Sequence, residues 1–373
     1  MITIKEAKTK KEIKRFVLFP FSLYKNNKYW IPPIIKDEID NFNPRKNPVF
    51  KHAQAQFFLA YKNKKLVGRV LAIINWYEVN EQNIKKMRFG WFDVVDDIEV
   101  TKALLDKVNE IGKQNNLEYI EGPVGFNNLD KTGVLIDGFD HLGTMITWYN
   151  HPYYKDHLEK LDFVKEKEYL ENKFKFKNVD ASYYSRVATV LKKRLEVKPI
   201  NFKKTKDILP YVDEMFEVFD KTYSKLATYV PISDEQKAYF KKKYISFINP
   251  EYIKFVMDKN DNLIAFAIVM PSFSEALQKA RGKLFPLGIF RLLKAKRHAK
   301  DVTFYLIGVH PDYQNKGITA IVFDEFAQTF EKKGIVNCIR TPELEENEAI
   351  RKIWEDFNPV THKRRRTYRK SIQ

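Results

Sequence analysis

The sequence predicts a mixed α/β (α+β) fold made of two similar halves, and three observations predict it. A pattern of apolar strand, polar turn and apolar strand at residues 57–74 returns at residues 253–270. A strand that leads into a helix follows each of these hairpins. A late helix at residues 153–163 has its counterpart at residues 349–357, and a charged strand follows each. Two units in the same order indicate a duplicated fold.

Length and composition agree with two domains. A chain of 373 residues is long enough for about two cores, and 44% hydrophobic residues supply the apolar side chains that two cores need. A charged stretch at residues 165–177 and a polar segment at residues 178–182 mark a boundary. We therefore expect an N-terminal half at residues 1–180 and a C-terminal half at residues 181–373.

The single cysteine limits the chemistry and the compartment. Cys338 lies in the apolar run 335–339, where we expect a buried strand. One cysteine excludes internal disulfides and multi-cysteine metal sites, so we expect no metal and a reducing compartment. Residues 1–6 are typical of a first strand and not of a signal peptide, and no apolar run approaches the roughly 18 residues that span a bilayer. We expect a cytoplasmic protein.

In the first half, residues 8–30 carry a helical pattern that we expect to break at Pro20. After the hairpin, a strand at residues 89–95 leads through the acidic pair 96–97 into a helix at residues 100–115. Two carboxylates at a helix start suit the helix dipole, but they repel an anionic ligand.

The second half differs at the corresponding place. Residues 303–309 read as a buried strand, and helical spacing from Ile318 runs to Gly334, a plausible helix cap. The loop between them contains Gln314 and Gly317. The first amides of the helix then face outward without carbonyl partners, which suits a phosphate group. A generic strand, turn and helix would have the same spacing.

The loop resembles a known signature. Val309-x-Pro311-x-x-Gln314-x-x-Gly317-x-Thr319 is similar to the acyl-CoA-binding motif of the GNAT (Gcn5-related N-acyltransferase) superfamily. The resemblance implies tandem GNAT-like folds, each a mixed, mostly antiparallel sheet flanked by helices. It also implies an acyl-CoA-dependent N-acyltransferase that takes acyl-CoA or acetyl-CoA as its substrate.

The same resemblance implies a set of cofactor-binding residues. The main chain of Ile307 and Val309 would pair with the thioester end and the pantetheine arm. The main-chain amides that would hold the pyrophosphate belong to Gln314, Asn315, Lys316, Gly317, Ile318 and Thr319. Thr319 departs from the glycine or alanine that is usual there, and its side chain would either crowd the phosphate or hydrogen-bond to it.

The catalytic groups are less well specified. The stretch from Asn347 to Trp354 resembles the late GNAT helix, in which an Asn contacts the cofactor and a Tyr seven residues on protonates the leaving thiolate. Trp354 stands in place of that Tyr, and an indole is no acid at neutral pH. His310 is the nearest titratable candidate for a catalytic base, with a chain of solvent and polar groups as the alternative. Tyr223 and Tyr229 are candidate substrate contacts or core aromatics.

The whole chain resembles two-half bacterial GNAT-like proteins, to which bacterial ceramide-synthase-type N-acyltransferases are similar. The acceptor implied is an amine, and a lipid or sphingoid base is one candidate. Because the first half lacks the glycine loop, we expect it not to bind CoA. Its glycine-rich stretch at residues 121–140 would either line an acceptor or acyl pocket or form a tightly folded loop between the domains.

Charge widens the range of partners. Sixty-six Lys and Arg against 48 Asp and Glu give a formal charge of +18, which favours CoA, acidic lipid or nucleic acid. A general enrichment in lysine would account for part of this charge. Nucleic acid is disfavoured, because no recognised motif is present and the charge is scattered. A CoA-binding regulator without catalytic activity would carry the same loop, so that alternative stays open.

One basic segment stands out between the second hairpin and the strand at residues 303–309. From Lys279 to Lys300 the chain has eight Lys or Arg and no acid, interspersed with apolar residues. One interpretation places this segment on an anionic lipid surface, with the protein peripheral at the inner membrane. The other buries its apolar side chains over the acyl-CoA cleft.

Overall fold

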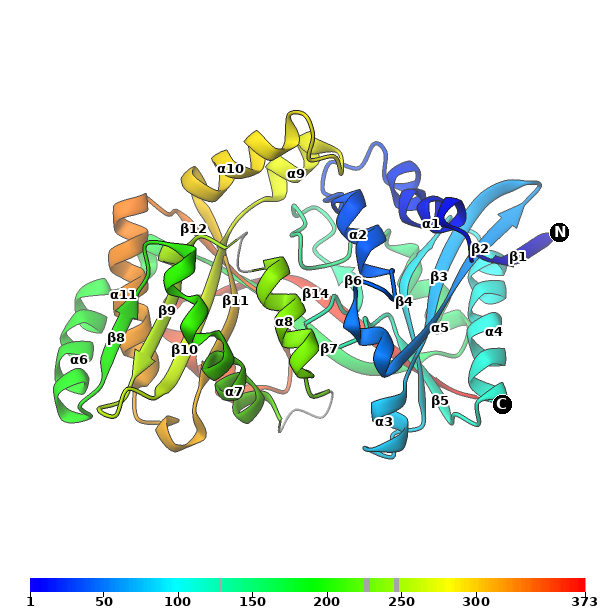
Figure 1. Cartoon of the computed structure of the whole chain (residues 1–373). Coiled ribbons are helices and arrows are strands. Elements are labelled where there is room, and N and C mark those ends of the chain that lie inside the picture. Colours follow the sequence, from blue (N-terminus) through cyan, green and yellow to red (C-terminus); the bar gives the residue numbers. More distant parts are fainter. Residues whose placement is uncertain (128, 225–228, 245–247, 373) are drawn as a thin grey trace. The chain divides into compact units, whose positions relative to one another are not determined.

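The computed structural model describes residues 1–372 except Asn128, 225–228 and 245–247. The chain forms two compact units (Figure 1). Unit 1 holds Met1–Leu170, Ser274–Ile289 and His362–Gln373, and unit 2 holds Glu171–Phe273 and Phe290–Thr361. The division at residues 180 and 181 stays a prediction, since each compact unit takes in segments from both sides of it.

Unit 1 contains the elements of the first half. Its strands are β1 (Ile2–Glu6), β2 (Ala53–Lys62), β3 (Lys65–Asn75), β4 (Lys86–Val94), β5 (Tyr119–Gly122), β6 (Val134–Asp137) and most of β14 (Val360–Ser371). Its helices are α1 (Lys10–Leu23), α2 (Ile35–Asn41), α3 (Trp76–Asn80), α4 (Ile98–Gln114), α5 (Tyr153–Lys160) and α9 (Ser274–Ala280).

Unit 2 repeats this plan. Its strands are β8 (Lys198–Asn201), β9 (Ile253–Met257), β10 (Leu263–Pro271), β11 (Asp301–Val309), β12 (Asn337–Arg340), β13 (Glu343–Leu344) and the end of β7 (Val164–Lys175). Its helices are α6 (Ala181–Arg194), α7 (Val212–Tyr223), α8 (Asp234–Tyr244), most of α10 (Gly288–His298), α11 (Ile318–Lys333) and α12 (Glu348–Trp354).

The sheets of the two units match strand for strand. The order is β1-β2-β3-β4-β5-β14 in unit 1 and β8-β9-β10-β11-β12-β7 in unit 2. Along each path the neighbours are antiparallel except one parallel pair, β4 with β5 and β11 with β12. The predicted duplication and the mixed, mostly antiparallel sheets are confirmed.

Helices cover both faces of the sheet in unit 1. Phe57 and Leu71 lie in one core cluster with Phe16 of α1, whereas Phe58 lies in another cluster with Leu104 of α4. Successive strand residues point to opposite faces, so α1 and α4 lie on opposite faces of this sheet.

The prediction that the first helix breaks at Pro20 is wrong, because α1 continues to Leu23. Proline has no N–H to donate to the carbonyl four residues earlier, which is that of Phe16. The carbonyl oxygen of Phe16 instead accepts a hydrogen bond of 2.7 Å from Nη1 of Arg69 on β3. A distant side chain therefore replaces the missing bond within the helix.

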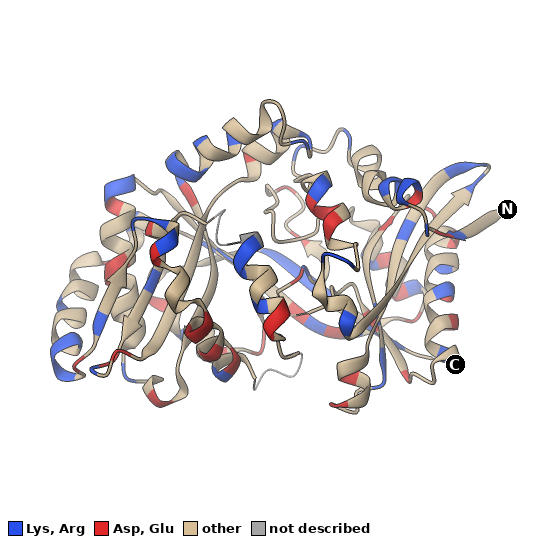
Figure 2. Cartoon of the chain, viewed as in Figure 1, with Lys and Arg blue, Asp and Glu red and all other residues tan. Residues whose placement is uncertain are grey.

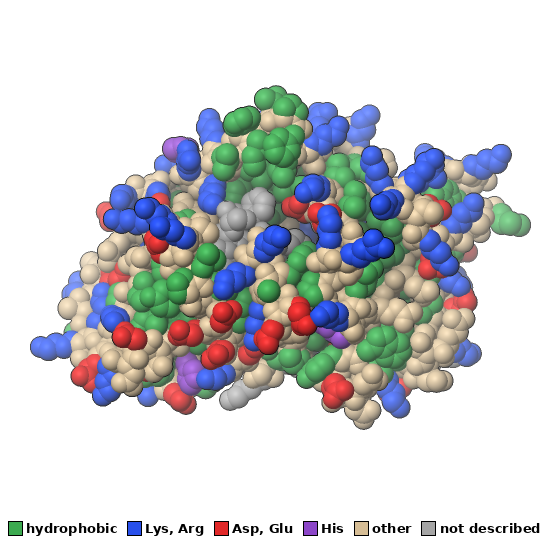
Figure 3. Space-filling view, viewed as in Figure 1, with side chains coloured by type: hydrophobic (Ala, Val, Ile, Leu, Met, Phe, Trp, Pro, Cys, Tyr) green, Lys and Arg blue, Asp and Glu red, His purple; other side chains and the backbone are tan. Residues whose placement is uncertain are grey.

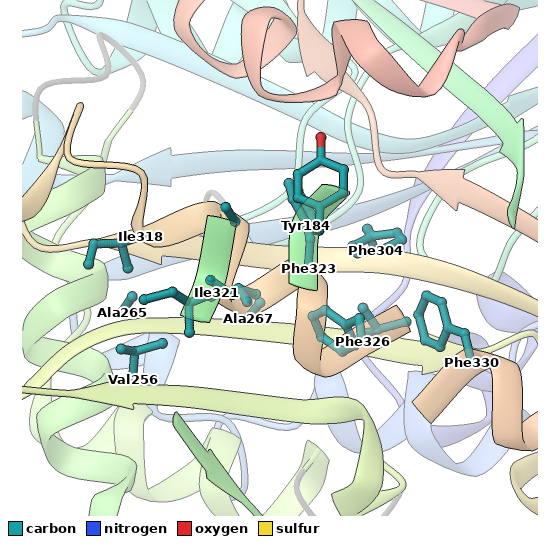
Figure 4. Close-up of a cluster of buried hydrophobic side chains, with 14 of the residues drawn as sticks. Tyr184, Val256, Ala265, Ala267, Phe304, Ile318, Ile321, Phe323, Phe326 and Phe330 are labelled. Carbon is teal, nitrogen blue, oxygen red and sulfur yellow. The ribbon is translucent and has the colours of Figure 1, made fainter. Parts of the chain in front are cut away.

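The core of unit 2 lies between α11 and its sheet (Figure 4). Ile318 and Ile321 of α11 lie close to the small side chains of Ala265 and Ala267 on β10 in that view. These small residues let the helix approach the strand closely. Cys338 of β12 is fully buried in the same core, as predicted, and burial raises the pKa of its thiol.

A buried lysine makes this core sensitive to pH. Lys254 on β9 is 3% exposed, and its ammonium group donates to Asn201 Oδ1 at 2.5 Å and to Thr329 Oγ1 at 2.8 Å. Burial lowers the pKa of Lys254 to about 8, against the opposing field of nearby Glu325.

We predict that stability rises with pH across the window in which Lys254 is charged only in the unfolded chain. This window runs from about 8 to the ordinary lysine pKa of 10.5. There the unfolded state binds more protons than the folded state, so the free energy of unfolding increases as the pH rises. Lys254→Met should remove this rise in urea denaturation at a series of pH values. The exposed control Lys203→Met should retain it, and a rise that persists in Lys254→Met would contradict the prediction.

Candidate functional site

The candidate site begins where β11 separates from β12. Their parallel pairing runs from Asp301 with Asn337 to Phe304 with Arg340 and then ends. Beyond Phe304, the strand partner of β11 among the described residues is β10. The last part of β11 therefore has one edge without a paired strand.

The register shows which residues face that edge. The N–H of His310 donates to the carbonyl oxygen of Ile264 at 2.8 Å. In an antiparallel pair, hydrogen-bonded and non-hydrogen-bonded residues alternate, so Gly308 faces β10. Ile307 and Val309 then direct their main-chain N–H and C=O groups to the open edge. These are the two strand residues that the sequence motif assigns to an acyl-CoA substrate.

A β-bulge lies at the same point of the strand. Ile268 of β10 is opposite Leu306, whereas the next residue, Val269, is opposite Phe304. Tyr305 is thus the extra residue. Bulges end regular pairing and re-aim neighbouring groups, and they are common beside active sites.

The turn after β11 is built for a tight change of direction. Asn315 and Gly317 both adopt positive φ angles, 60° and 79°. The side chain of Gln314 donates from Nε2 to the carbonyl oxygen of Val309 at 3.0 Å, which ties the turn back to the strand. A Cβ atom on Gly317 would lie 2.7 Å from Cδ1 of Leu191, so both conformation and packing require glycine here.

The turn delivers the chain to the N-terminus of α11. No side chain caps this helix, which runs for 16 residues. Gln314, Asn315, Lys316 and Gly317 are exposed. An uncapped, exposed helix start presents free amides and the positive end of the helix dipole, the arrangement that binds phosphate groups. The predicted cap at Gly334 is confirmed at the other end, where φ is 63°.

No family model matches the chain. It is 24% identical over 375 residues to Protein YghO of Escherichia coli (strain K12), covering 97% of this chain and 94% of the relative. It is 23% identical over 322 residues to a bacterial ceramide synthase of Caulobacter vibrioides (strain NA1000 / CB15N), covering 84% of this chain and 82% of the relative.

Solved structures establish the fold. A tandem GNAT protein from the clavulanic acid biosynthesis pathway aligns with a TM-score of 0.59 and 8% identity, covering 100% of this chain and 99% of that one. A GCN5-related N-acetyltransferase from Sphaerobacter thermophilus aligns with a TM-score of 0.53 and 8% identity, covering 100% and 96%. The protein has the tandem GNAT fold.

Helix α7 of unit 2 contacts the open edge of β11 through two residues. Tyr223 donates from its hydroxyl to the carbonyl oxygen of Ile307 at 3.0 Å, and Thr222 donates to that of Val309 at 3.1 Å. Burial raises the pKa of Tyr223 to about 12, so it stays neutral and a donor. The sequence pointed to Tyr223 as an aromatic, but nothing in the pattern distinguished Thr222.

The other predicted site residues occupy different surroundings. Asn347 caps α12, with its Oδ1 accepting from the N–H of Ile350 at 3.2 Å. Trp354, at the end of α12, is 1% exposed and packs edge-on against Phe304 with ring centroids 4.8 Å apart. Tyr229 donates to the carboxylate of Asp220 at 2.5 Å.

His310 follows β11 directly, and both of its ring nitrogens have neighbours. Nδ1 lies 3.3 Å from the N–H of Asp312, and Nε2 lies 3.3 Å from the ammonium group of Lys221 on α7. One of these contacts must open before either nitrogen can accept a proton from a substrate. The catalytic role of His310 stays a prediction.

In unit 1, the segment that follows β5 packs against β4 just beyond the parallel pair. The parallel pairing of β4 with β5 ends at Arg88 and Glu121. The next carbonyl, that of Phe89, accepts from the N–H of Val124 at 2.8 Å. A Cβ on Gly90 would lie 2.3 Å from the carbonyl oxygen of Val124, so the two segments are in close contact.

Two tyrosines complete this closure. The N–H of Val94, at the end of β4, donates to the hydroxyl of Tyr154 at 2.8 Å. The carbonyl oxygen of Val94 accepts from the hydroxyl of Tyr153 at 2.6 Å. Both main-chain groups of Val94, the last residue of β4, are therefore already paired.

The helix after β4 is also capped. Asp97 accepts from the N–H of Glu99 at 3.2 Å and forms an ion pair of 2.6 Å with Lys62. Its hydrogen bond to Lys62 lowers the pKa of Asp97, so a negative charge holds the start of α4. The sequence predicted carboxylates at this helix start, and their repulsion of an anionic ligand stays a prediction.

The described residues contain no group of three or more His, Cys, Asp and Glu side chains placed to hold a metal ion. A search of the same residues finds no helix long and apolar enough to cross a bilayer.

Proposed function

We propose that the protein is an acyl-CoA-dependent N-acyltransferase whose substrate site lies in unit 2. The observation that carries this proposal is the junction of an open strand edge at Ile307 and Val309 with the uncapped start of α11. The open edge suits the amide-rich pantetheine arm, which pairs like a strand. The amides from Asn315 to Thr319 at the start of α11 suit the pyrophosphate, whereas the N–H of Gln314 already donates to the carbonyl oxygen of Pro311 at 3.2 Å.

In the proposed reaction the amine nitrogen attacks the thioester carbonyl carbon. A C–N bond forms, the C–S bond breaks, and CoA leaves as a thiolate. A main-chain N–H on the open edge of β11 would stabilise the developing oxyanion. The amine proton passes to His310 after its contact with Lys221 opens, or to solvent.

The leaving thiolate has no acid at Trp354, because an indole keeps its proton at neutral pH. An unperturbed thiol has a pKa of about 8.5, so the thiolate can leave as such and take a proton from water. The alternative of a CoA-binding regulator rests on this same absence of an acid, and detection of acylated product separates the two.

The name of one relative supports a proposal for the acceptor and for the donor length. The name bacterial ceramide synthase, on a relative at 23% identity, supports a lipid-like amine such as a sphingoid base as the acceptor and a long acyl chain on the donor. A cytoplasmic location, where acyl-CoA is made, is part of the same proposal.

The first test is CoA binding by isothermal titration calorimetry. Gly317→Asp adds a negative charge at the start of α11, where we propose the pyrophosphate binds, whereas Gly317→Asn has the same shape without the charge and tolerates a positive φ. We expect both variants to bind CoA more weakly than wild type, with the Asp variant at least about tenfold weaker than the Asn variant, or about 1.4 kcal/mol. Wild type that binds no CoA, or an Asp variant that binds as well as the Asn variant, would refute the site.

The second test is the number of CoA sites per chain. Because the end of β4 is paired and α4 is capped by Asp97, we expect one site in equilibrium titration of wild type. Gly317→Asp should abolish that single site at the concentrations that saturate wild type. Two sites per chain would show that unit 1 also binds CoA.

The third test compares donors of different length with a sphingoid base as acceptor. Each buried methylene contributes about 0.8 kcal/mol, so burial of even a few more carbons favours palmitoyl-CoA over acetyl-CoA by orders of magnitude in kcat/KM. Equal kcat/KM values for the two donors would disprove the long-chain proposal and leave the CoA site intact.

A further inference from the structure

Helix α10 and the turn before it carry an exposed apolar surface. Phe285 and Phe290 are 77% and 67% exposed, and they are the most exposed phenylalanines of the described chain. Leu287 and Leu293 are also exposed. We call these four side chains the α10 patch. Figure 3 shows apolar side chains gathered over this helix and turn, with basic ones beside them.

The outward face of the helix is also basic. Phe290, Leu293, Lys294 and Arg297 follow the spacing i, i+3, i+4 and i+7, so they share one face of α10, and all four are exposed. Leu292, on the opposite face, is buried. In Figure 2, α10 carries basic residues and no acidic ones. Apolar and cationic side chains therefore project in the same direction.

The turn that carries the first half of the patch is held in place. The hydroxyl of Ser274 donates to the carbonyl oxygen of Gly143 at 2.8 Å, and Gln278 donates to that of Trp30 at 3.1 Å. The carbonyl oxygen of Gly282 accepts from the N–H of Ile35 at 3.0 Å. These bonds anchor α9 and the residue Gly282 that lead into the turn, in which Phe285 and Leu287 are exposed.

The end of the helix is held as well. The side chain of Asn249 donates to the carbonyl oxygen of Lys296 at 3.3 Å, and Leu292 packs inward. The two interpretations of the sequence are thereby distinguished for these residues. Leu292 is buried as the cleft interpretation requires, whereas the four side chains of the α10 patch face outward.

We propose that the α10 patch docks the protein on an anionic lipid surface. Phenylalanine and leucine insert at the boundary between headgroups and acyl chains, and long basic side chains beside them reach the phosphate groups. No Asp or Glu occurs from Ala276 to Lys300, so nothing in this segment opposes an acidic surface. This charge pattern favours lipid over a protein partner, because the complementary surface of a protein would have to be both apolar and acidic.

Docking would serve the proposed function but does not depend on it. A lipid-like amine resides in a membrane, and a protein held at that surface meets it there. The proposal concerns where the chain binds, so vesicle binding can be present in a protein with no transferase activity.

The test is co-sedimentation of the full chain with vesicles made of equal parts phosphatidylcholine and phosphatidylglycerol. We expect binding at low salt that weakens as salt rises from about 0.1 M to about 1 M, where the screening length falls from about 10 Å to about 3 Å. Vesicles of phosphatidylcholine alone should bind at least about tenfold more weakly, since each nearby basic residue contributes about fivefold on anionic lipid.

Two variants separate the patch from general charge. Phe285→Ser/Phe290→Ser should lose most vesicle binding, and Lys294→Gln/Arg297→Gln should lose about twentyfold. The matched control Lys193→Gln/Arg194→Gln removes the same charge from exposed positions on α6 and should bind like wild type. All three variants change exposed side chains, so their melting temperatures should match that of wild type.

Three outcomes would overturn the proposal. Failure of wild type to sediment with anionic vesicles would leave a protein partner as the occupant of the patch. Equal loss of binding in the α6 control and the α10 charge variant would assign the effect to net charge. A phenylalanine variant that keeps vesicle binding but loses its preference for long donors would assign the patch to the acyl chain.

Discussion

Backbone N–H and C=O groups that leave water must find partners, and this requirement separates the two units. Each unit has one parallel strand pair that stops after a few residues, which leaves the main chain beyond it without a partner strand. One main-chain bond past the parallel pair is common to both units, from Val124 to Phe89 in unit 1 and from Thr341 to Phe304 in unit 2. At the end of β4 in unit 1, the hydroxyls of Tyr153 and Tyr154 pair with both main-chain groups of Val94. In unit 2 the carbonyl oxygens of Ile307 and Val309 accept from three side chains, and among the described residues no strand covers this edge.

The N-termini of α4 in unit 1 and α11 in unit 2 differ in the same way. Asp97 caps α4 and brings a negative charge, whereas α11 begins at Gly317 without a side-chain cap. A duplicated fold has thus kept one scaffold and varied the groups at a single junction. Val94 at the end of β4 has both main-chain groups paired, whereas α11 starts among exposed residues without a side-chain cap.

Local patterns in the sequence predicted much of the fold. The hairpins β2/β3 and β9/β10, the cap of α11 at Gly334 and the buried strand around Cys338 all depend on near neighbours, so periodicity and turn chemistry indicated them. The prediction at Pro20 was wrong because Arg69, a residue 49 positions later, satisfies the carbonyl that proline leaves unpaired. No local rule contains that partner.

In the candidate site, too, local patterns indicated some residues and missed those that depend on tertiary packing. The motif from Val309 to Thr319 is contiguous, so one strand, turn and helix bring its residues together. The sequence did not indicate Thr222 as a site residue, and it gave no partner for the hydroxyl of Tyr223. Both hydroxyls bond to β11 only when α7 packs on the sheet, which no local pattern predicts. The exposure of Phe285 and Phe290 likewise depends on how the turn is anchored, which composition does not reveal.

Hydrogen–deuterium exchange of the full chain with and without CoA tests the central claim most directly, because it reports on individual stretches of backbone amide. The account predicts slower exchange on CoA addition in the peptides that cover residues 305–320 and unchanged exchange in those that cover residues 89–101. Protection over residues 89–101, or none over residues 314–319, would contradict it.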